Sequence, residues 1–257
     1  MKRNLIAVLF SLVSLLLTAS CSKFSNGEPV TEQRSIGQRF NTLCMFNNVN
    51  VNLMHSNNPH MELTCPKNLI DNIFTEVEGD SLIIRNDNDF NWLRSYDYTI
   101  DLTVYYDSLS VINFASTGRL ISLDTLRGMS VLDSVQSTVN CLTLQVTEGC
   151  GDIDLTLNCD VFHNRFTNGT SDVVLHGLTA YSDHDLQSYG KVDASDLNSN
   201  FVRVQSKSTN DTYVLVRDGG GLRTFIYSLG NIYYKGNPSP QYTSHENHGD
   251  GRLIKLE

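Results

Sequence analysis

The second half of the chain repeats itself with a period of about 20 residues, a length found in stacked-repeat folds. Residues 146–155 are echoed by residues 166–175, and one mostly charged position recurs along the chain at nearly even spacing. Such a fold is expected because a single short repeat cannot bury its own apolar face without its neighbours. The recurring position is occupied by Asp152, Asp172, Lys191, Asp211, Asn231 and Arg252.

Apolar residues follow the same period. The residue directly after each recurring position is apolar or small, and so is the residue two places after that one. The residue between these two is mostly polar or amphipathic, as alternation along a strand requires. The first of these columns comprises Ile153, Val173, Val192, Thr212, Ile232 and Leu253, and the second comprises Leu155, Leu175, Ala194, Val214 and Tyr234. We expect a third apolar column at Val146, Phe166, Leu186, Val204 and Phe225.

These patterns predict an all-β fold, a right-handed parallel β-helix (β-solenoid) with rungs of roughly 20 residues. A two-sheet β-sandwich is the alternative, because short strands joined by turns are its signature too. No stretch of 12 or more residues sustains a helical period, and only one helical turn is expected, within residues 66–73. We expect a single domain over residues 35–257, with an N-terminal β region (35–105) that caps the repeat rungs (106–257).

The N-terminus has the features of a bacterial lipoprotein. Two positive residues precede an apolar run over residues 5–17, which predicts a signal peptide over residues 1–20. The sequence Leu-Thr-Ala-Ser-Cys at 17–21 resembles a lipobox, although Thr18 stands where the pattern usually has Leu; a plain secretory site is the alternative. We expect lipidated Cys21 to anchor the chain, and residues 21–34 to form a tether. This predicts a bacterial cell-envelope protein held at the outer membrane, on its periplasmic or its surface face.

Charge and cysteine content exclude some partners. The 257 residues include 19 Lys+Arg and 28 Asp+Glu, a net charge of −9, which argues against nucleic acid as a partner. The cysteines other than Cys21 contain no Cys-x-x-Cys pair, so neither a zinc site nor a thioredoxin-type motif is indicated. We expect buried thiols, with a disulfide as the alternative, at Cys44, Cys65, Cys141, Cys150 and Cys159.

The C-terminal part carries a family motif. The motif consists of Gly230, Asn231, Ile232, Tyr233, Tyr234, Lys235, Gly236, Asn237 and Pro238. Together with residues 249–256, it resembles the terminal signature of the putative auto-transporter adhesin head domain, the GIN domain, and the resemblance covers roughly residues 35–256. The resemblance implies a lipid-anchored or secreted β-helical domain with an adhesive role.

Candidate chemistry is sparse. Asp152 and Asp172 should lie about 5 Å apart in neighbouring rungs, where like charges repel unless a cation bridges them. They are a candidate for a weak Ca²⁺ site, with solvated turn residues as the alternative; no other cofactor is expected. His163 and His184 are interpreted as surface polar residues. Because no catalytic cluster is recognised, we expect no enzymatic activity, and a β-helical glycan lyase or hydrolase is the alternative.

One candidate ligand-binding surface remains. Tyr213 and Tyr233 should stand side by side on an outward face, with Lys235 two residues along the same strand. Adjacent rings suit a sugar or a peptide aromatic, although they also stabilise a sheet simply by packing on each other. We therefore predict a non-catalytic adhesion or binding module for a glycan or protein ligand. A structural envelope lipoprotein without an external ligand is the alternative, and the sequence does not indicate the oligomeric state.

Overall fold

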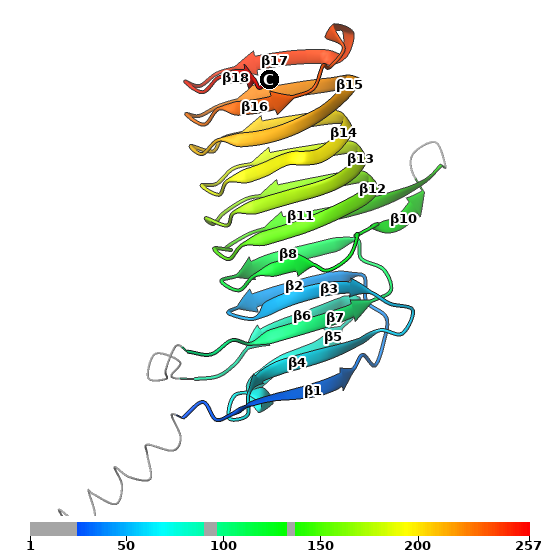
Figure 1. Cartoon of the computed structure of the whole chain (residues 1–257), viewed down its shortest axis with the longest axis vertical. Helices are drawn as coiled ribbons and strands as arrows, with labels where there is room; N and C mark the ends of the chain where they lie inside the picture. Colours follow the sequence, from blue (N-terminus) through cyan, green and yellow to red (C-terminus); the bar gives the residue numbers. More distant parts are fainter. Residues whose placement is uncertain (1–24, 90–96, 133–136) are drawn as a thin grey trace, which may run out of the picture.

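The computed structural model describes residues 25–89, 97–132 and 137–257, and these form an all-β protein, as predicted (Figure 1). Its strands join one continuous 18-stranded sheet, and the predicted helical turn is the 3₁₀ turn η2 (Ile70–Asn72). In the described part of the chain, no helix is both long and apolar enough to cross a bilayer.

The strands are β1 (Pro29–Ser35), β2 (Thr42–Asn47), β3 (Asn50–His55), β4 (His60–Pro66), β5 (Ile73–Glu78), β6 (Ser81–Asn86), β7 (Asp101–Tyr106), β8 (Val111–Ser116), β9 (Leu120–Ser122), β10 (Met129–Leu132), β11 (Thr138–Val146), β12 (Ile153–Phe166), β13 (Val173–Leu186), β14 (Val192–Ser206), β15 (Thr212–Ile226), β16 (Ile232–Lys235), β17 (Thr243–Asn247) and β18 (Leu253–Lys255). A second 3₁₀ turn, η4 (Pro240–Tyr242), precedes β17.

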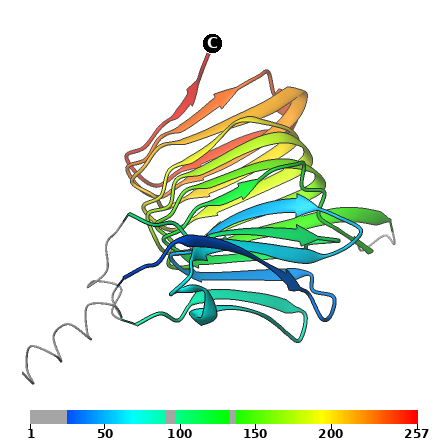
Figure 2. The same ribbon diagram turned by 60° about the horizontal axis from the view of Figure 1, so that its bottom comes forward.

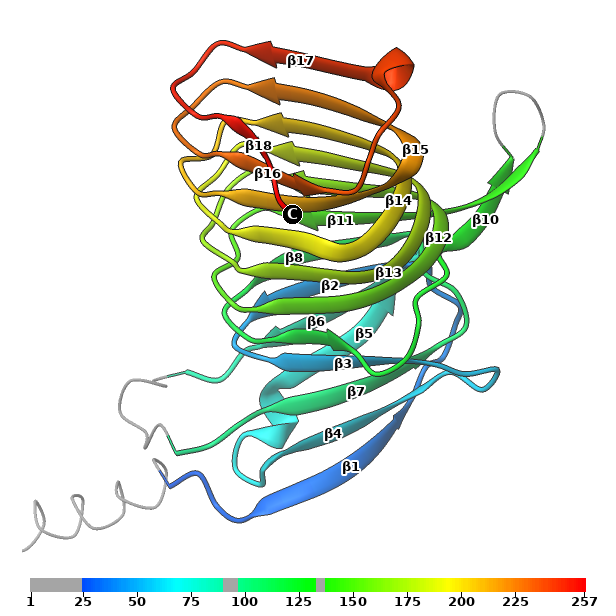
Figure 3. The same cartoon turned by 45° about the horizontal axis from the view of Figure 1, so that its top comes forward.

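Successive repeats pair in parallel. Strands β12 to β15 are 14 or 15 residues long, and each bends midway, so that its first arm and its second arm lie on different sides of the stack (Figure 3). Tight turns, here called corners, connect the end of one strand to the start of the next. The first predicted column is confirmed, because the ladder joins Ile153 to Val173, Val173 to Val192, Val192 to Thr212, Thr212 to Ile232 and Ile232 to Leu253.

The third predicted column is wrong in its last two members. Leu186 pairs with Ser206, and Ser206 pairs with Ile226, so the ladder keeps the regular period through these strands. Val204 is also buried, but it occupies the position two residues earlier, and Phe225 lies on the outward side of β15. The prediction failed because Ser206, only 1% exposed, is a small polar residue in an apolar position.

The N-terminal half joins the same stack out of chain order. Strand β2 pairs in parallel with both β6 and β8, and β3 pairs in parallel with both β7 and β9. The β2–β3 segment therefore lies between two segments that follow it in the sequence (Figure 1). Among the described strands, pairing is antiparallel only at the N-terminal end, where β1 pairs with β4, β4 with β7 and β5 with β6, and in the β10–β11 hairpin, which projects from the stack (Figure 1).

The tether expected over residues 21–34 is wrong from Pro29 onward. Strand β1 pairs with β4 over its full length, from Pro29 opposite Pro66 to Ser35 opposite His60, and lies at the N-terminal end of the sheet (Figure 2). The Arg34 guanidinium also donates hydrogen bonds to the Ile70 carbonyl (2.9 Å) and the Thr75 hydroxyl (2.8 Å). These contacts fix a segment whose polar composition resembled a linker.

The C-terminal end of the stack is closed by polar residues. Every residue of β17 is exposed, although β17 continues the parallel ladder of β15. Its Thr243, His245 and Asn247 align with inward-facing positions of β15. Apolar residues at these three positions of β17 would be exposed to water, because every residue of β17 is exposed. His245 also pairs with Thr224 across the ladder, at 2.8 Å between its Nδ1 and the threonine hydroxyl. A polar last repeat is the expected way to end a stack.

Replacing Gly177 by alanine should destabilise the protein by about 2–3 kcal/mol, because two features of this site oppose a side chain. The residue has φ of +104°, and an added Cβ would lie 2.0 Å from the Leu157 carbonyl oxygen of the neighbouring strand. Gly37→Ala is the matched control, since an added Cβ there meets no atom within 4 Å. Urea unfolding measures both variants; equal midpoints would show that the bend of β13 tolerates a side chain.

Candidate functional site

Asp152 and Asp172 occupy stacked corners, as predicted. The Ile153 amide donates to the Asp172 carbonyl (2.8 Å), which places the two corners in adjacent layers, and both aspartates are exposed. Among the described residues, no group of three or more His, Cys, Asp or Glu side chains is arranged to hold a metal ion. A calcium ion between this pair stays a prediction.

The predicted tyrosine pair is assembled in the structure. The ring centroids of Tyr213 and Tyr233 lie 4.9 Å apart with an interplanar angle of 9°, so the rings stack face to face. Lys191 Nζ lies 5.4 Å from the Tyr213 ring centroid, and Lys235 follows Tyr233 at the ladder position opposite Leu215. Because the ring faces turn toward each other, the pair presents mainly its edges to a ligand.

The family motif has a packing role in the corners around β16. An added Cβ at Gly230 would lie 2.2 Å from the Asn210 carbonyl oxygen, and one at Gly236, where φ is +93°, would lie 1.9 Å from the Val216 carbonyl oxygen. Asn231 Oδ1 accepts a hydrogen bond from the Arg252 amide (2.9 Å). The motif therefore contains residues that allow adjacent corners to approach closely.

A charged cluster that sequence reasoning did not assign lies on the second arms. Asp183 accepts hydrogen bonds from Arg165 Nη2 and Arg203 Nη1, both at 2.8 Å, and lies 3.4 Å from His163 Nδ1. Its side chain is only 7% exposed. Burial by itself would raise the pKa of Asp183, but the hydrogen bonds from His163, Arg203 and Arg165 outweigh burial and hold the pKa well below its usual range. The regular spacing of His163, Asp183 and Arg203, one repeat apart, was the signal that could have identified this cluster.

His184 is buried inside the stack, so its interpretation as a surface residue is wrong. It is 0% exposed and pairs in the ladder with Asn164, which is equally buried. Neither ring nitrogen of His184, nor either amide atom of Asn164, has a hydrogen-bond partner among the described residues. Burial lowers the pKa of His184 to about 4, with a smaller opposing effect from Asp183. Its burial removes His184 from any contact with an external substrate.

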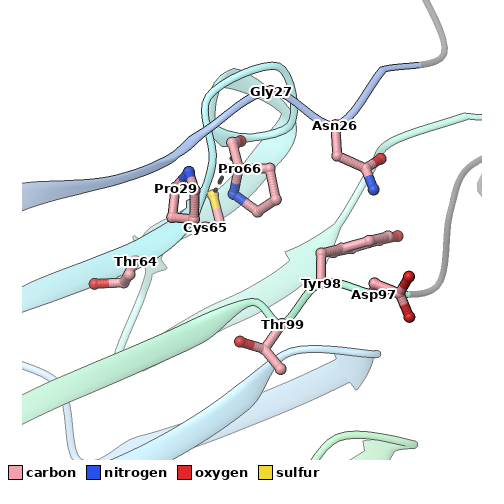
Figure 4. Close-up of a pocket in the computed structure, with 9 residues that line it drawn as sticks. All are labelled: Asn26, Gly27, Pro29, Thr64, Cys65, Pro66, Asp97, Tyr98 and Thr99. Carbon is pink, nitrogen blue, oxygen red and sulfur yellow. Dashed lines mark hydrogen bonds between the residues drawn. The ribbon is translucent and has the colours of Figure 1, made fainter.

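A cavity of about 460 Å³ lies at the N-terminal end. Figure 4 shows Pro29, Cys65 and Pro66 on one side of it and Tyr98 with Asp97 on the other. The Cys65 thiol is 1% exposed, and burial raises its pKa to about 11, so it stays protonated at neutral pH. This thiol is therefore not an activated nucleophile.

A second cavity of about 390 Å³ lies where β15 bends from its first to its second arm. Two aromatic residues, Phe201 and Tyr242, line it together with the glycine run 219–221. Its polar lining consists of Asn200, Arg217 and Asp218. The cavity therefore combines aromatic surface, backbone without side chains, and charged groups near the C-terminal end. Sequence reasoning missed this site, although the three consecutive glycines mark it.

Comparison with solved structures supports the fold. A "putative adhesin" from Bacteroides fragilis NCTC 9343 is 18% identical, has a TM-score of 0.76 and covers 90% of this chain and 99% of its own. A "putative lipid binding protein" from Parabacteroides distasonis ATCC 8503 is 16% identical with a TM-score of 0.60, covering 90% of this chain and 98% of its own. A "putative adhesin" from Parabacteroides merdae ATCC 43184 is 15% identical with a TM-score of 0.58, covering 91% and 98%.

The sequence comparisons agree with the family that the C-terminal motif resembles. None of the curated proteins compared with the chain matches it. The family model described as "Putative auto-transporter adhesin, head GIN domain" matches residues 39–238, which is most of the chain. The protein therefore belongs to this family, the "Putative auto-transporter adhesin, head GIN domain" family.

Proposed function

We propose that the protein is a non-catalytic adhesion or ligand-binding module of the bacterial cell envelope, and that its C-terminal repeats bind the ligand. Its family and two of the three solved structures described above carry adhesin names, and the third is named a lipid binding protein, which supports this assignment. The observation that carries it is the uneven distribution of charge. Residues 203–257 contain 7 Lys+Arg and 5 Asp+Glu, whereas residues 1–202 contain 12 and 23.

Tyrosines are concentrated in the same part of the molecule. Seven of the 11 tyrosines lie within residues 181–242, and Tyr189, Tyr227 and Tyr242 among them are between 42% and 63% exposed. Exposed tyrosine is common in binding surfaces, because its ring provides contact area and its hydroxyl a hydrogen bond. An acidic body with an aromatic, more basic end suits the binding of a partner at that end.

We further propose that the stacked repeats form a right-handed β-solenoid, anchored through acyl chains on Cys21. The parallel ladders, whose offsets stay close to the sequence period, support the solenoid over the sandwich. Cys21 lies outside the described residues. Strand β1 and strands β17 and β18 lie at opposite ends of the stack (Figure 1), so an anchor preceding β1 would leave the C-terminal repeats directed away from the membrane.

The double substitution Tyr213→Ser with Tyr233→Ser tests whether the stacked pair contributes to binding. We expect binding of the full-chain protein to a glycan array and to cells to fall at least tenfold, while the free energy of unfolding falls by about 1 kcal/mol from the lost ring stacking. His60→Ser with Tyr105→Ser is the matched control, because these rings also stack, with centroids 4.1 Å apart, but lie in the acidic half.

The control variant should lose comparable stability and keep its binding. Equal losses of binding in both double variants would show that the Tyr213–Tyr233 pair has no specific role in binding. Wild-type protein that binds neither array nor cells, and that resists protease added to intact bacteria, would support a structural envelope lipoprotein instead.

A further inference from the structure

Two aromatic side chains, Phe201 and Tyr242, line the cavity at the bend of β15. An added Cβ at Gly221 would lie 2.4 Å from the Phe201 ring and 3.1 Å from Tyr242 Cβ. The Phe201 ring therefore packs directly on Gly221, in the space that a side chain would occupy. Tyr242, at the end of η4, lines the same cavity and is 56% exposed. The resulting hollow of about 390 Å³ is within the usual range for small-ligand sites.

Gly219 keeps one side of the hollow open. Gly219 has φ of +79°, a conformation that other residues adopt only with strain, and no atom lies within 4 Å of the place where its Cβ would stand. At Gly220 and Gly221, by contrast, an added Cβ would lie 2.1 Å from the Asn200 carbonyl oxygen and 2.4 Å from the Phe201 ring. Gly219 therefore provides the turn and the room for a ligand, whereas the other two glycines allow close packing.

Polar groups at the rim are held in defined positions. Arg217 Nη1 donates to Asn200 Oδ1 (3.1 Å), and Asp218 Oδ1 accepts from the Asn237 amide (2.8 Å). A sugar ring has C–H groups that pack on an aromatic face and hydroxyls that pair with amide, carboxylate and guanidinium groups. This combination of surfaces favours a saccharide over a purely apolar ligand.

Arg223 adds a free positive charge. It follows Gly221 by two residues on the same side of β15, about 7 Å along the strand, and it is exposed. Its ladder neighbour Arg203 is already paired with Asp183 and Gln205, at 2.8 and 2.9 Å. Arg223 itself makes no ion pair or hydrogen bond with any residue that the structure describes. A guanidinium without a counter-ion favours a carboxylate, which it can bind through two parallel hydrogen bonds.

We propose that this cavity binds a carboxylated sugar unit, with the ring against Phe201 and Tyr242 and the carboxylate on Arg223. The inference rests on the proposed binding function and names its ligand class. The excess of positive charge in residues 203–257 favours an anionic saccharide for the same reason.

The test compares oligogalacturonate with its methyl ester, which keeps the ring and removes the charge. Titration of the full-chain protein should show tighter binding of the acid. Arg223→Gln should weaken binding of the acid by about 10-fold to 100-fold and leave binding of the ester unchanged. Tyr242→Ser should weaken both. The matched control is Arg119→Gln, an exposed arginine in the acidic half, and it should change neither.

The proposal would be overturned by equal binding of acid and ester or by an equal effect of Arg119→Gln. Equally tight binding of oligoglutamate would also overturn it and would indicate an acidic peptide. Unfolding midpoints of the variants show whether a loss of binding reflects a loss of folded protein. Wild-type protein that binds cells or a glycan array but not oligogalacturonate would refute this ligand class and leave the proposed function standing. Failure of wild-type binding on cells, array and oligogalacturonate alike would refute both.

Discussion

Lowering the pH from 6.5 to 4 is expected to reduce the free energy of unfolding by about 3 kcal/mol through the protonation of His184. A histidine in the unfolded chain titrates near pH 6.5, whereas burial lowers the pKa of His184 in the folded protein to about 4. Between these values the unfolded chain binds a proton that the folded protein does not. The contribution of neutral His184 to the free energy of unfolding is therefore fully present above pH 6.5 and is lost as the pH falls toward 4.

The charged groups around His184 do not share this pH window. Asp183 precedes it in β13, and Arg165 adjoins Asp183 in the neighbouring strand. The pKa of Asp183 is held below its usual value of 3.8, so the stability that its ionised form provides is present at pH 4 and is lost only at lower pH. A decrease in stability between pH 6.5 and 4 therefore reports on histidine rather than on this carboxylate.

His184→Leu should abolish that decrease. The variant should be at least as stable as the wild type at pH 7, because it removes two buried nitrogens that have no partner among the described residues. His176→Gln is the control, since His176 lies on the outward face between Asp154 and Asp196, at 3.4 and 3.6 Å. Urea unfolding at half-unit pH steps measures both variants. If the free energy of unfolding of His184→Leu still falls between pH 6.5 and 4 as it does in the wild type, another group is responsible for the decrease.

The repeat period could be predicted from sequence because each stacked position selects its residue type. The column that begins at Ile153 lies inward in every repeat, so apolar or small residues recur there. Ser206 broke the third column because a buried position at the end of a strand also accepts a small polar residue. Strands β2 and β3 could not be placed, since Thr42 pairs with Ser81 and with Val111, and neither offset follows the period of the repeats.

The candidate sites were predictable only in part. The repeat offset predicted that Tyr213 and Tyr233 would meet, but it does not determine ring orientation, which depends on side-chain torsions. The Phe201–Gly221 pair has the same offset of 20 residues, but it was missed because a glycine has no side chain to mark a position in a column. Asp183 was missed because a charged residue in a strand pattern is usually solvated.

Asp183→Asn is expected to lower the free energy of unfolding by about 3 kcal/mol at pH 7, because it removes the carboxylate from a nearly buried ion-pair cluster. Arg165 and Arg203 both point their guanidinium groups at this side chain, at 2.8 Å, and the substitution would leave two positive charges without their shared counter-ion. An amide has one acceptor oxygen and a donor group that faces these cations unfavourably. The loss should therefore exceed that of an ordinary hydrogen bond.

Asp185→Asn is the matched control, two residues further along β13. Its carboxylate accepts only longer hydrogen bonds from the amide groups of Gln187 and Gln205, at 3.2 to 3.4 Å, and it makes no ion pair with a described residue. Its substitution should cost less than about 1 kcal/mol. Urea midpoints at pH 7, in low and high salt, measure both variants. The cost of Asp183→Asn should persist in high salt, since the cluster is shielded from solvent, whereas a cost that disappears with added salt would mean that Asp183 acts as an ordinary surface charge.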